Sequence, residues 1–238
     1  MRGRKLSAVK LSPNMIDGTF VARVNRFAAL VQVDGHETLV HVANSGRLRE
    51  LFQEGMQVLL TPVDGAASRK TRYDLTLVDL GHTLVSADAR LPNAIVYEAI
   101  KSGQVAELLG YSDVLREQAL EESRIDLLLL RDDTRCYVEV KSATLVQDSV
   151  ALFPDAPTAR GRRHLETLVH AVRQGWGGVV VFVVQREDAQ SFAPHDAADP
   201  DFGKALRHAH REGVKVYAYG CRVTRQEITL AQRLPVLL

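Results

Sequence analysis

The residues best suited to chemistry in this chain are two carboxylates and a lysine on either side of a short turn. Asp126 precedes the apolar run 127–130, and Glu139 and Lys141 lie in the β-forming segment that follows. Asp132-Asp133 separates the two segments and predicts a hairpin. If the hairpin is symmetric about this pair, opposed residues have numbers that sum to 265, and Asp126 faces Glu139.

Such an arrangement predicts a site for a divalent cation. Opposed residues have Cβ atoms about 4.5–5.5 Å apart, and carboxylates that close repel unless a positive charge lies between them. Lys141 lies on the same strand face as Glu139, because side chains alternate along a strand. Mg²⁺ or Mn²⁺ suits the oxygen ligands, and the lysine can orient a water or stabilise phosphate charge. A solvated salt-bridge cluster is the alternative, and Asp-Asp lacks the glycine that tight hairpin turns prefer.

The order of an aspartate, a hairpin and Glu-x-Lys resembles the D…E-x-K core of the restriction-endonuclease-like nucleases. That resemblance implies catalytic and metal-binding roles for Asp126 and Glu139 and a catalytic role for Lys141. It also implies a further ligand in Glu98, whose position corresponds to an acidic residue that some nucleases of this fold add to the metal site. A solvated helix glutamate is the competing interpretation of Glu98.

Composition sets few limits on function. The 238 residues suffice for one large or two modest domains, and the net charge of +1 means that nucleic-acid binding would need a local basic patch. No apolar run is long enough to span a bilayer, and the basic start does not lead into a secretory signal. Two cysteines, Cys136 and Cys221, lack metal-ligand spacing and favour a reducing cytoplasm.

Elements in the first part of the chain predict a small β-barrel, most simply an OB-fold. We expect one long strand and four shorter ones, with a short helical piece after Asn44-Ser45-Gly46: strands at 19–33, 38–42, 57–63, 73–80 and 83–85, and the helical piece at 48–52. Near 86–92 the pattern changes from strand-like segments to a helical one. The predicted domains are therefore 1–86, an OB-like barrel, and 87–238.

The second part predicts an α/β domain with a mixed sheet. Apolar spacing of i, i+3, i+4, i+7 favours a helix at 163–173, and the all-apolar run 179–184 is typical of a central strand. Further expected elements are helices at 93–101 and 202–211 and strands at 114–121 and 214–219. The order helix, three strands, helix, strand is that of the restriction-endonuclease-like core.

Most of the chain resembles the sugar fermentation stimulation protein A family. The strongest matching stretches are Glu122–Asp126, Tyr137–Ser142, and Phe153–Thr158 with the following Arg160-Gly161 and His164-Leu165. Weaker matches are Arg26-Phe27, His41–Gly46, Asn93–Ile100 and 199–214. The resemblance implies DNA, single- or double-stranded, as the partner, and a link to the regulation of sugar-utilisation genes.

Several residues near these stretches are candidates for DNA or accessory contacts. Arg160, Arg162 and Arg163 cluster at a helix start, where free N–H groups and arginine forks bind phosphate. Asp155 either contacts a metal-bound water or caps a turn, and His164 is either a proton relay or a structural hydrogen-bond donor.

The first domain offers a second basic set. Arg23, Arg26 and Arg72 are interleaved with aromatic residues such as Phe27, which is typical of OB-folds that stack bases in a basic groove. The alternative is that Phe27 belongs to the core and the arginines are solvated. Asn44-Ser45-Gly46 is either a phosphate-binding nest or a plain turn.

Two functions therefore remain open at this point. The first is a Mg²⁺- or Mn²⁺-dependent DNA phosphodiesterase, which the intact Asp, Glu and Lys favour. The second is a DNA-binding regulator of sugar-utilisation genes that retains a nuclease fold without cleaving, although no helix-turn-helix pattern is evident.

Overall fold

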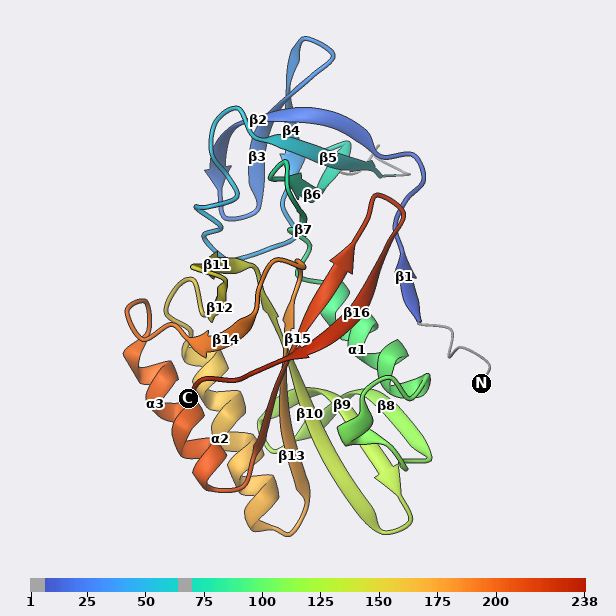
Figure 1. Cartoon of the computed structure of the whole chain (residues 1–238), viewed down its shortest axis with the longest axis vertical. Coiled ribbons are helices and arrows are strands. Elements are labelled where there is room, and N and C mark those ends of the chain that lie inside the picture. Colours follow the sequence, from blue (N-terminus) through green and yellow to red (C-terminus); the bar gives the residue numbers. More distant parts are fainter. Residues whose placement is uncertain (1–6, 64–69) are drawn as a thin grey trace.

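The computed structural model describes residues 7–63 and 70–238, which form a β-barrel and a larger α/β domain (Figure 1). The barrel strands follow the order β4-β3-β2-β5-β6-β7, and an additional β4–β6 pairing through His41 and Asp74 closes the ring. β2 to β6 thus form a closed five-stranded barrel, and β7 adds a short strand beside β6. This barrel confirms the predicted OB-fold. The strand bounds are β2 (Ile16–Asn25), β3 (Ala28–Val33), β4 (His36–His41), β5 (Gln57–Pro62), β6 (Tyr73–Asp79) and β7 (Leu84–Ser86).

The long strand predicted over 19–33 is wrong, because the chain reverses at Arg26-Phe27 and makes two strands. Asn25 causes the reversal: its Oδ1 accepts a hydrogen bond of 2.8 Å from the backbone N–H of Phe27. The helix expected over 48–52 is also absent. A single turn takes its place, in which the N–H groups of Leu51 and Phe52 bond the carbonyl of Leu48.

The α/β domain is built on a seven-stranded mixed sheet of order β1-β16-β15-β13-β10-β9-β8. Its strands are β1 (Ala8–Lys10), β8 (Asp113–Leu120), β9 (Ser123–Arg131), β10 (Thr134–Ala143), β13 (Gly177–Val184), β15 (Lys215–Val223) and β16 (Glu227–Leu234). β10, β13 and β15 run parallel to one another, and β8, β9, β16 and β1 extend the sheet by antiparallel pairing.

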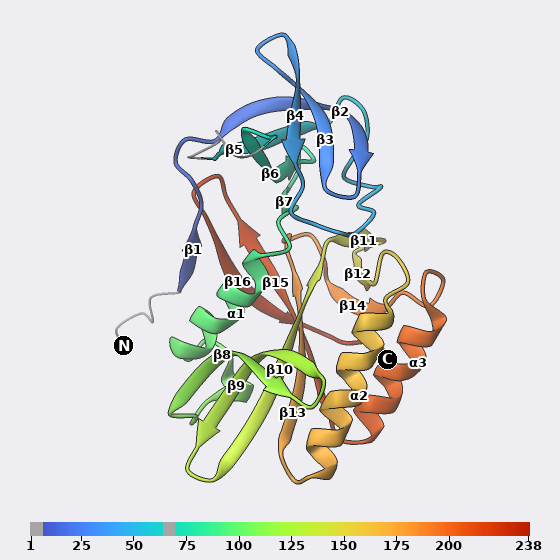
Figure 2. The same ribbon diagram turned by 180° about the vertical axis from the view of Figure 1, so that it is seen from behind.

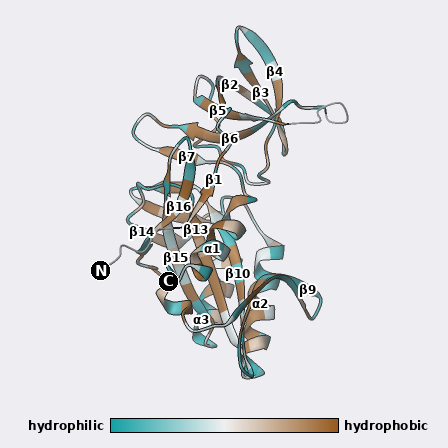
Figure 3. Cartoon of the chain, turned by 90° about the vertical axis from the view of Figure 1, so that its right-hand side faces the viewer, coloured by the Kyte–Doolittle hydropathy of each residue, from teal (hydrophilic) through white to brown (hydrophobic). Residues whose placement is uncertain are grey.

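Helices cover both faces of this sheet. α2 (Ala159–Arg173) and α3 (Pro200–Arg211) pack on one face against Phe182 and its neighbours, and α1 (Leu91–Lys101) packs on the other against Val138 and Val181 (Figures 1 and 2). The central strand, β13, is covered on both faces and is therefore a continuous apolar run, which Figure 3 shows as brown ribbon in the interior. A short 3-10 turn, η2 (Ala106–Leu108), follows α1. No helix in the described ranges is long and apolar enough to cross a bilayer.

The hairpin between β9 and β10 has the register that the sequence predicts. Arg131 pairs with Thr134, and the pairs continue with numbers that sum to 265 as far as Leu127 and Val138. The turn is the pair Asp132-Asp133, and Asp132 takes the left-handed conformation with φ 51°, which aspartate tolerates better than most residues.

Three features of the fold have no counterpart in the sequence analysis. β1 lies in the range assigned to the first domain, but it pairs with β16 and so belongs to the larger sheet. A small sheet of β11 (Leu145–Gln147), β12 (Val150–Phe153) and β14 (Ser191–Pro194) lies between the barrel and the starts of α2 and α3 (Figure 1). α2 begins at Ala159, four residues earlier than predicted.

Candidate metal and phosphate site

Asp126 lies where β9 and β10 part. The ladder of backbone pairs between the two strands ends at Leu127 and Val138. Two residues farther along β10, the N–H of Val140 donates to Oδ2 of Asp126 at 2.8 Å. The side-chain amide of Asn93, in the first turn of α1, donates to Oδ1 at 2.7 Å. The carboxylate is therefore fixed on both oxygens beside β10.

A neighbouring negative charge acts on Asp126. Burial raises its pKa first, and the charge of Glu139 raises it further, against the hydrogen bonds from Val140 and Asn93. The charge of Glu139 thus acts on Asp126, and such repulsion is the condition that favours a cation between two carboxylates.

One carboxylate oxygen of Glu139 contacts two side chains, a lysine and a histidine. It is 2% exposed, and its Oε1 contacts both the Nζ of Lys141 and the Nδ1 of His164 on α2. Burial acts to raise the pKa of Glu139, but the bond from His164 and the charge of Lys141 outweigh it and lower the pKa overall. Its Oε2 is buried and has no hydrogen-bond partner among the described residues.

The early start of α2 puts His164 and Arg160 in this site. Thr158 caps the helix, and its Oγ1 accepts a 3.0 Å hydrogen bond from the N–H of Gly161. Asp199, which caps α3 through Phe202, also accepts a 2.7 Å bond from the N–H of Thr158. One carboxylate therefore fixes the starts of both helices.

The three predicted arginines of α2 have different environments. The Nε of Arg160 donates to the Nε2 of His164 at 3.3 Å, and Arg160 also lines the pocket described next. Arg162 is paired with Asp199, with 3.1 Å between Nη1 and Oδ2. Arg163 is exposed. The structure therefore brings only Arg160 of this cluster to the site.

A pocket of about 500 Å³ opens in front of these residues, between the barrel and the larger domain. Lys141, Ser142, Asp155 and Arg160 contribute to its wall. Asp126 and Glu139 are not among its lining residues. Of the predicted catalytic set, Lys141 is thus the residue that reaches the pocket wall.

A second hollow of about 630 Å³ continues from this pocket over the barrel. The two share walls formed by residues of the barrel and of the segment before α2: Arg26, Ser45, Gly46, Ala156 and Pro157. Arg47 and Arg49 add to the second hollow, which no Asp or Glu lines. We call this hollow the arginine groove. Arg47 and Arg49 are not among the predicted DNA-binding residues, although Arg47 directly follows the Asn44-Ser45-Gly46 motif and Arg49 lies two residues farther on.

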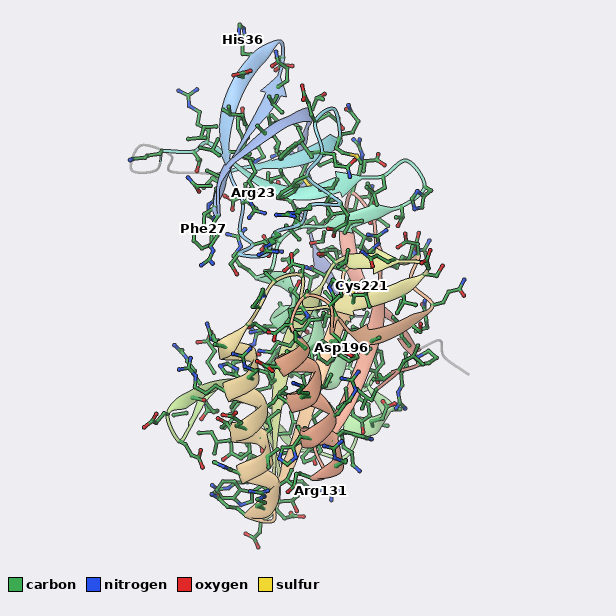
Figure 4. The ribbon with its side chains drawn as sticks, turned by 90° about the vertical axis from the view of Figure 1, so that its left-hand side faces the viewer. Arg23, Phe27, His36, Arg131, Asp196 and Cys221 are labelled. Carbon is green, nitrogen blue, oxygen red and sulfur yellow. The ribbon has the colours of Figure 1, made fainter. Side chains whose placement is uncertain are left out.

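Arg23, predicted to bind DNA, has its donors on the chain's own backbone. Its guanidinium bonds the carbonyls of Asn25, Arg26, Asn44, Gly46 and Arg47 at 2.5–3.1 Å. Arg23 therefore shapes the floor of the groove. Figure 4 shows Arg23 and Phe27 at the end of the barrel nearest the larger domain, and Phe27 is 49% exposed, so it is not a core residue.

The loop of Asn44-Ser45-Gly46 is held by two side chains. Oδ1 of Asn44 accepts from the N–H of Gly46 at 2.9 Å, and Oδ2 of Asp155 accepts from the N–H of Leu48 at 3.0 Å. Asp155 thus caps a turn of the barrel from the larger domain, as one of its two interpretations proposed.

Two predicted residues lie away from the site. Glu98 is on the exposed side of α1, five residues beyond Asn93, so the two point in different directions. Arg72 is exposed beside β6 and lines neither hollow. Asn93 takes the place next to Asp126 that the analysis sought for Glu98. Its position at a helix start beside an aspartate-bearing strand could not be read from periodicity.

The donor set fits a hard divalent ion. Within the described residues no three His, Cys, Asp or Glu side chains gather into a metal-binding group. Two carboxylates remain, and one of them has a buried oxygen for which residues 7–63 and 70–238 provide no hydrogen-bond partner. Mg²⁺ is commonly bound by one or two carboxylates with waters and substrate phosphates, so this pair suffices for it.

Comparisons with known proteins cover both domains. The family model described as "Sugar fermentation stimulation protein RE domain" matches residues 90–227, and that described as "SfsA N-terminal OB domain" matches residues 21–87. A sugar fermentation stimulation protein homolog of Caldanaerobacter subterraneus subsp. tengcongensis is 45% identical, over 94% of this chain and 97% of that protein. One from Desulforamulus reducens is 42% identical, over 95% of this chain and 94% of that protein.

A solved structure agrees with these matches. The structure of Pyrococcus furiosus SfsA in complex with Ca²⁺ has a TM-score of 0.89 and 30% sequence identity, and the alignment covers 98% of this chain and all of that one. With an OB barrel, a restriction-endonuclease-like domain and these relatives, the chain belongs to the sugar fermentation stimulation protein (SfsA) family.

Proposed function

We propose that this protein is a divalent-metal-dependent phosphodiesterase that cleaves DNA, with Mg²⁺ or Mn²⁺ held by Asp126 and Glu139. The observation that carries the proposal is the buried Oε2 of Glu139, which has no hydrogen-bond partner among the described residues and belongs to a carboxylate that repels Asp126. A buried ionised oxygen without a partner is costly, and a bound cation would remove that cost.

The solved relative supports the choice of ion. That protein was solved in complex with Ca²⁺, a hard cation that takes oxygen ligands as Mg²⁺ does. We extend that property to this chain because the carboxylate pair here offers the same kind of donor.

The residues of the site would have separate roles in phosphodiester hydrolysis. A divalent ion, when bound, would polarise the phosphate and lower the pKa of a water. Lys141, on the pocket wall, is placed to orient the attacking water or stabilise phosphate charge, and Arg160 can donate to a phosphate oxygen. The water oxygen forms a new bond to phosphorus as the bond to the leaving sugar oxygen breaks.

The arginine groove supports DNA as the substrate. Arg26, Arg47 and Arg49 face a hollow without carboxylates that runs into the pocket of Lys141. A backbone held by these arginines would continue past the site, and phosphate contacts of this kind supply most of the affinity of non-specific DNA binding. The near-neutral net charge is compatible with this, since the positive charge is local.

A cleavage assay tests the proposal. End-labelled single-stranded and duplex DNA are incubated with wild type, Glu139→Ala and Glu166→Ala, with Mg²⁺, with Mn²⁺ and with EDTA. We expect divalent-dependent cleavage by wild type, none by Glu139→Ala, and wild-type cleavage by Glu166→Ala. Glu166 is the matched control because it lies exposed on α2 two residues beyond His164.

DNA binding measured beside cleavage separates the outcomes. Glu139→Ala should bind DNA as well as wild type or more tightly, since it loses a negative charge near the phosphate. Wild type that binds DNA but cleaves no form of it with either ion would contradict the proposal and favour a non-cleaving regulator.

A further inference from the structure

Glu139 has two inequivalent oxygens, because His164 and Lys141 both contact Oε1. The Nδ1 of His164 contacts Oε1, while Oε2 is left without a partner among the described residues. Both residues are nearly inaccessible, at 2% exposed for Glu139 and 5% for His164. A carboxylate in such a place cannot exchange its oxygens freely, so the contacts with His164 and Lys141 set which oxygen remains for a ligand. Of the two, the ring of His164 is the more rigid.

The ring of His164 is itself held from the other side. The Nε of Arg160 carries a proton and donates to the Nε2 of His164 at 3.3 Å, so Nε2 must accept and Nδ1 must carry the proton. That tautomer donates to Glu139. The spacing of four residues places Arg160 and His164 on one face of α2, above Glu139 on β10.

Rigid elements fix this chain of contacts. Thr158 and Asp199 hold the first turn of α2, and Glu139 lies in the middle of β10, paired with Val180 of β13. The backbone at Arg160, His164 and Glu139 is therefore anchored. The imidazole ring of His164 has little freedom to turn away from the carboxylate of Glu139.

We infer that His164 is a positioning residue, which donates from Nδ1 to Glu139 and so turns Oε2 toward a divalent ion, with Arg160 fixing the tautomer. The inference rests on the proposed function, because it assigns a role toward the metal. It requires no proton transfer by His164. Removing a residue that hydrogen-bonds to a metal ligand typically weakens metal binding by about 10- to 100-fold.

Two substitutions separate a donor at Nδ1 from simple packing. In His164→Asn the side-chain nitrogen is bonded to Cγ, as Nδ1 is, whereas in His164→Gln the nitrogen lies one bond farther out and matches Nε2. Ca²⁺ affinity is measured by calorimetry without DNA, and thermal stability is measured in EDTA. We expect His164→Asn to bind Ca²⁺ within about threefold of wild type and His164→Gln to bind it at least about tenfold more weakly.

The alternatives give different results. Equal Ca²⁺ affinity in wild type, His164→Asn and His164→Gln would overturn the inference while the proposed function stands. Equal weakening of both variants would overturn the role of Nδ1 and indicate packing alone. If wild type itself binds no Ca²⁺, the metal site fails, and the inference fails with it.

A measurement on wild type covers the case in which both variants unfold. Long-range ¹H–¹⁵N NMR of the metal-free protein reports which ring nitrogen of His164 carries the proton. We expect a protonated Nδ1 and a bare Nε2. A ring with its proton on Nε2 cannot accept from Arg160 or donate to Glu139 from Nδ1, and would refute the inference without any variant.

Discussion

Lys141 has a different task from the carboxylates beside it, and one substitution should show this. Lys141 lines the pocket, whereas Glu139 does not and has a second contact, with His164. We expect Lys141→Met to lower DNA cleavage by at least about 100-fold, a loss typical of removing a donor to developing charge. Ca²⁺ affinity at neutral pH should stay within a few-fold of wild type.

The same variant has a pH signature. The charge of Lys141 lowers the pKa of Asp126, against burial and the charge of Glu139, which raise it. Without the lysine this pKa must rise, so Asp126 becomes ionised only at higher pH. Calorimetry across pH should therefore show the onset of Ca²⁺ binding moved to higher pH in Lys141→Met. An onset that does not move, or that moves to lower pH, would contradict this effect of Lys141 on Asp126.

Arg23 and Arg26 form a matched pair that tests structural against DNA-binding roles. Arg23 bonds backbone carbonyls of the loop, while Arg26 faces both hollows. We expect Arg23→Lys to reduce the free energy of unfolding by about 1–3 kcal/mol, because a lysine cannot satisfy the same carbonyls. Arg26→Met should leave stability unchanged and weaken DNA binding. Urea unfolding and anisotropy titrations with DNA measure the two effects, and an interchange of the results would contradict these roles.

The residue types alone could not distinguish these arginines. Both lie in the same basic and aromatic segment, and only the folded loop shows that the donors of Arg23 point inward. The same limit applies to Asn93, whose role depends on where the start of α1 meets β9.

At the scale of elements, local patterns predicted more. The register of β9 and β10 followed from a two-residue turn alone, because each further pair repeats the same sum. The reversal at Asn25 was missed because strand propensity on both sides is high and no glycine marks the turn. A side-chain oxygen that accepts from the N–H of Phe27 replaces that signal.

Asp199 is the element-scale residue with the clearest energetic role. Burial would raise its pKa, but the N–H groups of Thr158 and Phe202 and the charge of Arg162 lower it overall. A folded-state pKa below the unfolded value of about 3.9 stabilises the fold above that pH, and the contribution is lost as pH falls through the folded pKa. The ionised carboxylate therefore contributes to holding the starts of α2 and α3 at neutral pH, and this contribution falls as the group is protonated.

We expect Asp199→Ala to reduce the free energy of unfolding at pH 7 by about 2–4 kcal/mol, since two helix starts lose their acceptor. Asp199→Asn keeps an acceptor without the charge and should lose less. Denaturant unfolding at several pH values measures both. The gap between wild type and Asp199→Asn should narrow below about pH 4; a gap that widens in acid would mean that the charge does not stabilise these helix starts.

At the scale of the whole molecule, the two domains are joined by contacts that no local pattern predicts. The three residues of β1 are too short for a strand signal, yet they cross to the larger sheet and pair with β16. Asp155 reaches from the larger domain to the N–H of Leu48, next to the loop that carries Arg47 and Arg49. The arginine groove depends on this docking, and so neither domain's sequence reveals it alone.

The arginine groove should determine how strongly DNA binding depends on salt concentration. Each phosphate contact contributes a slope of about −0.9 for duplex and about −0.7 for single-stranded DNA to a plot of log affinity against log salt concentration. Replacing Arg26, Arg47 and Arg49 by Ala should therefore flatten the slope by up to about 2.7 units for duplex or about 2.1 for single strands. Arg163→Ala is the control, because Arg163 lies exposed on α2 and lines neither hollow. An unchanged slope in the triple variant would mean that the backbone follows another path, and a flattened slope in the control would move that path toward the outer face of α2.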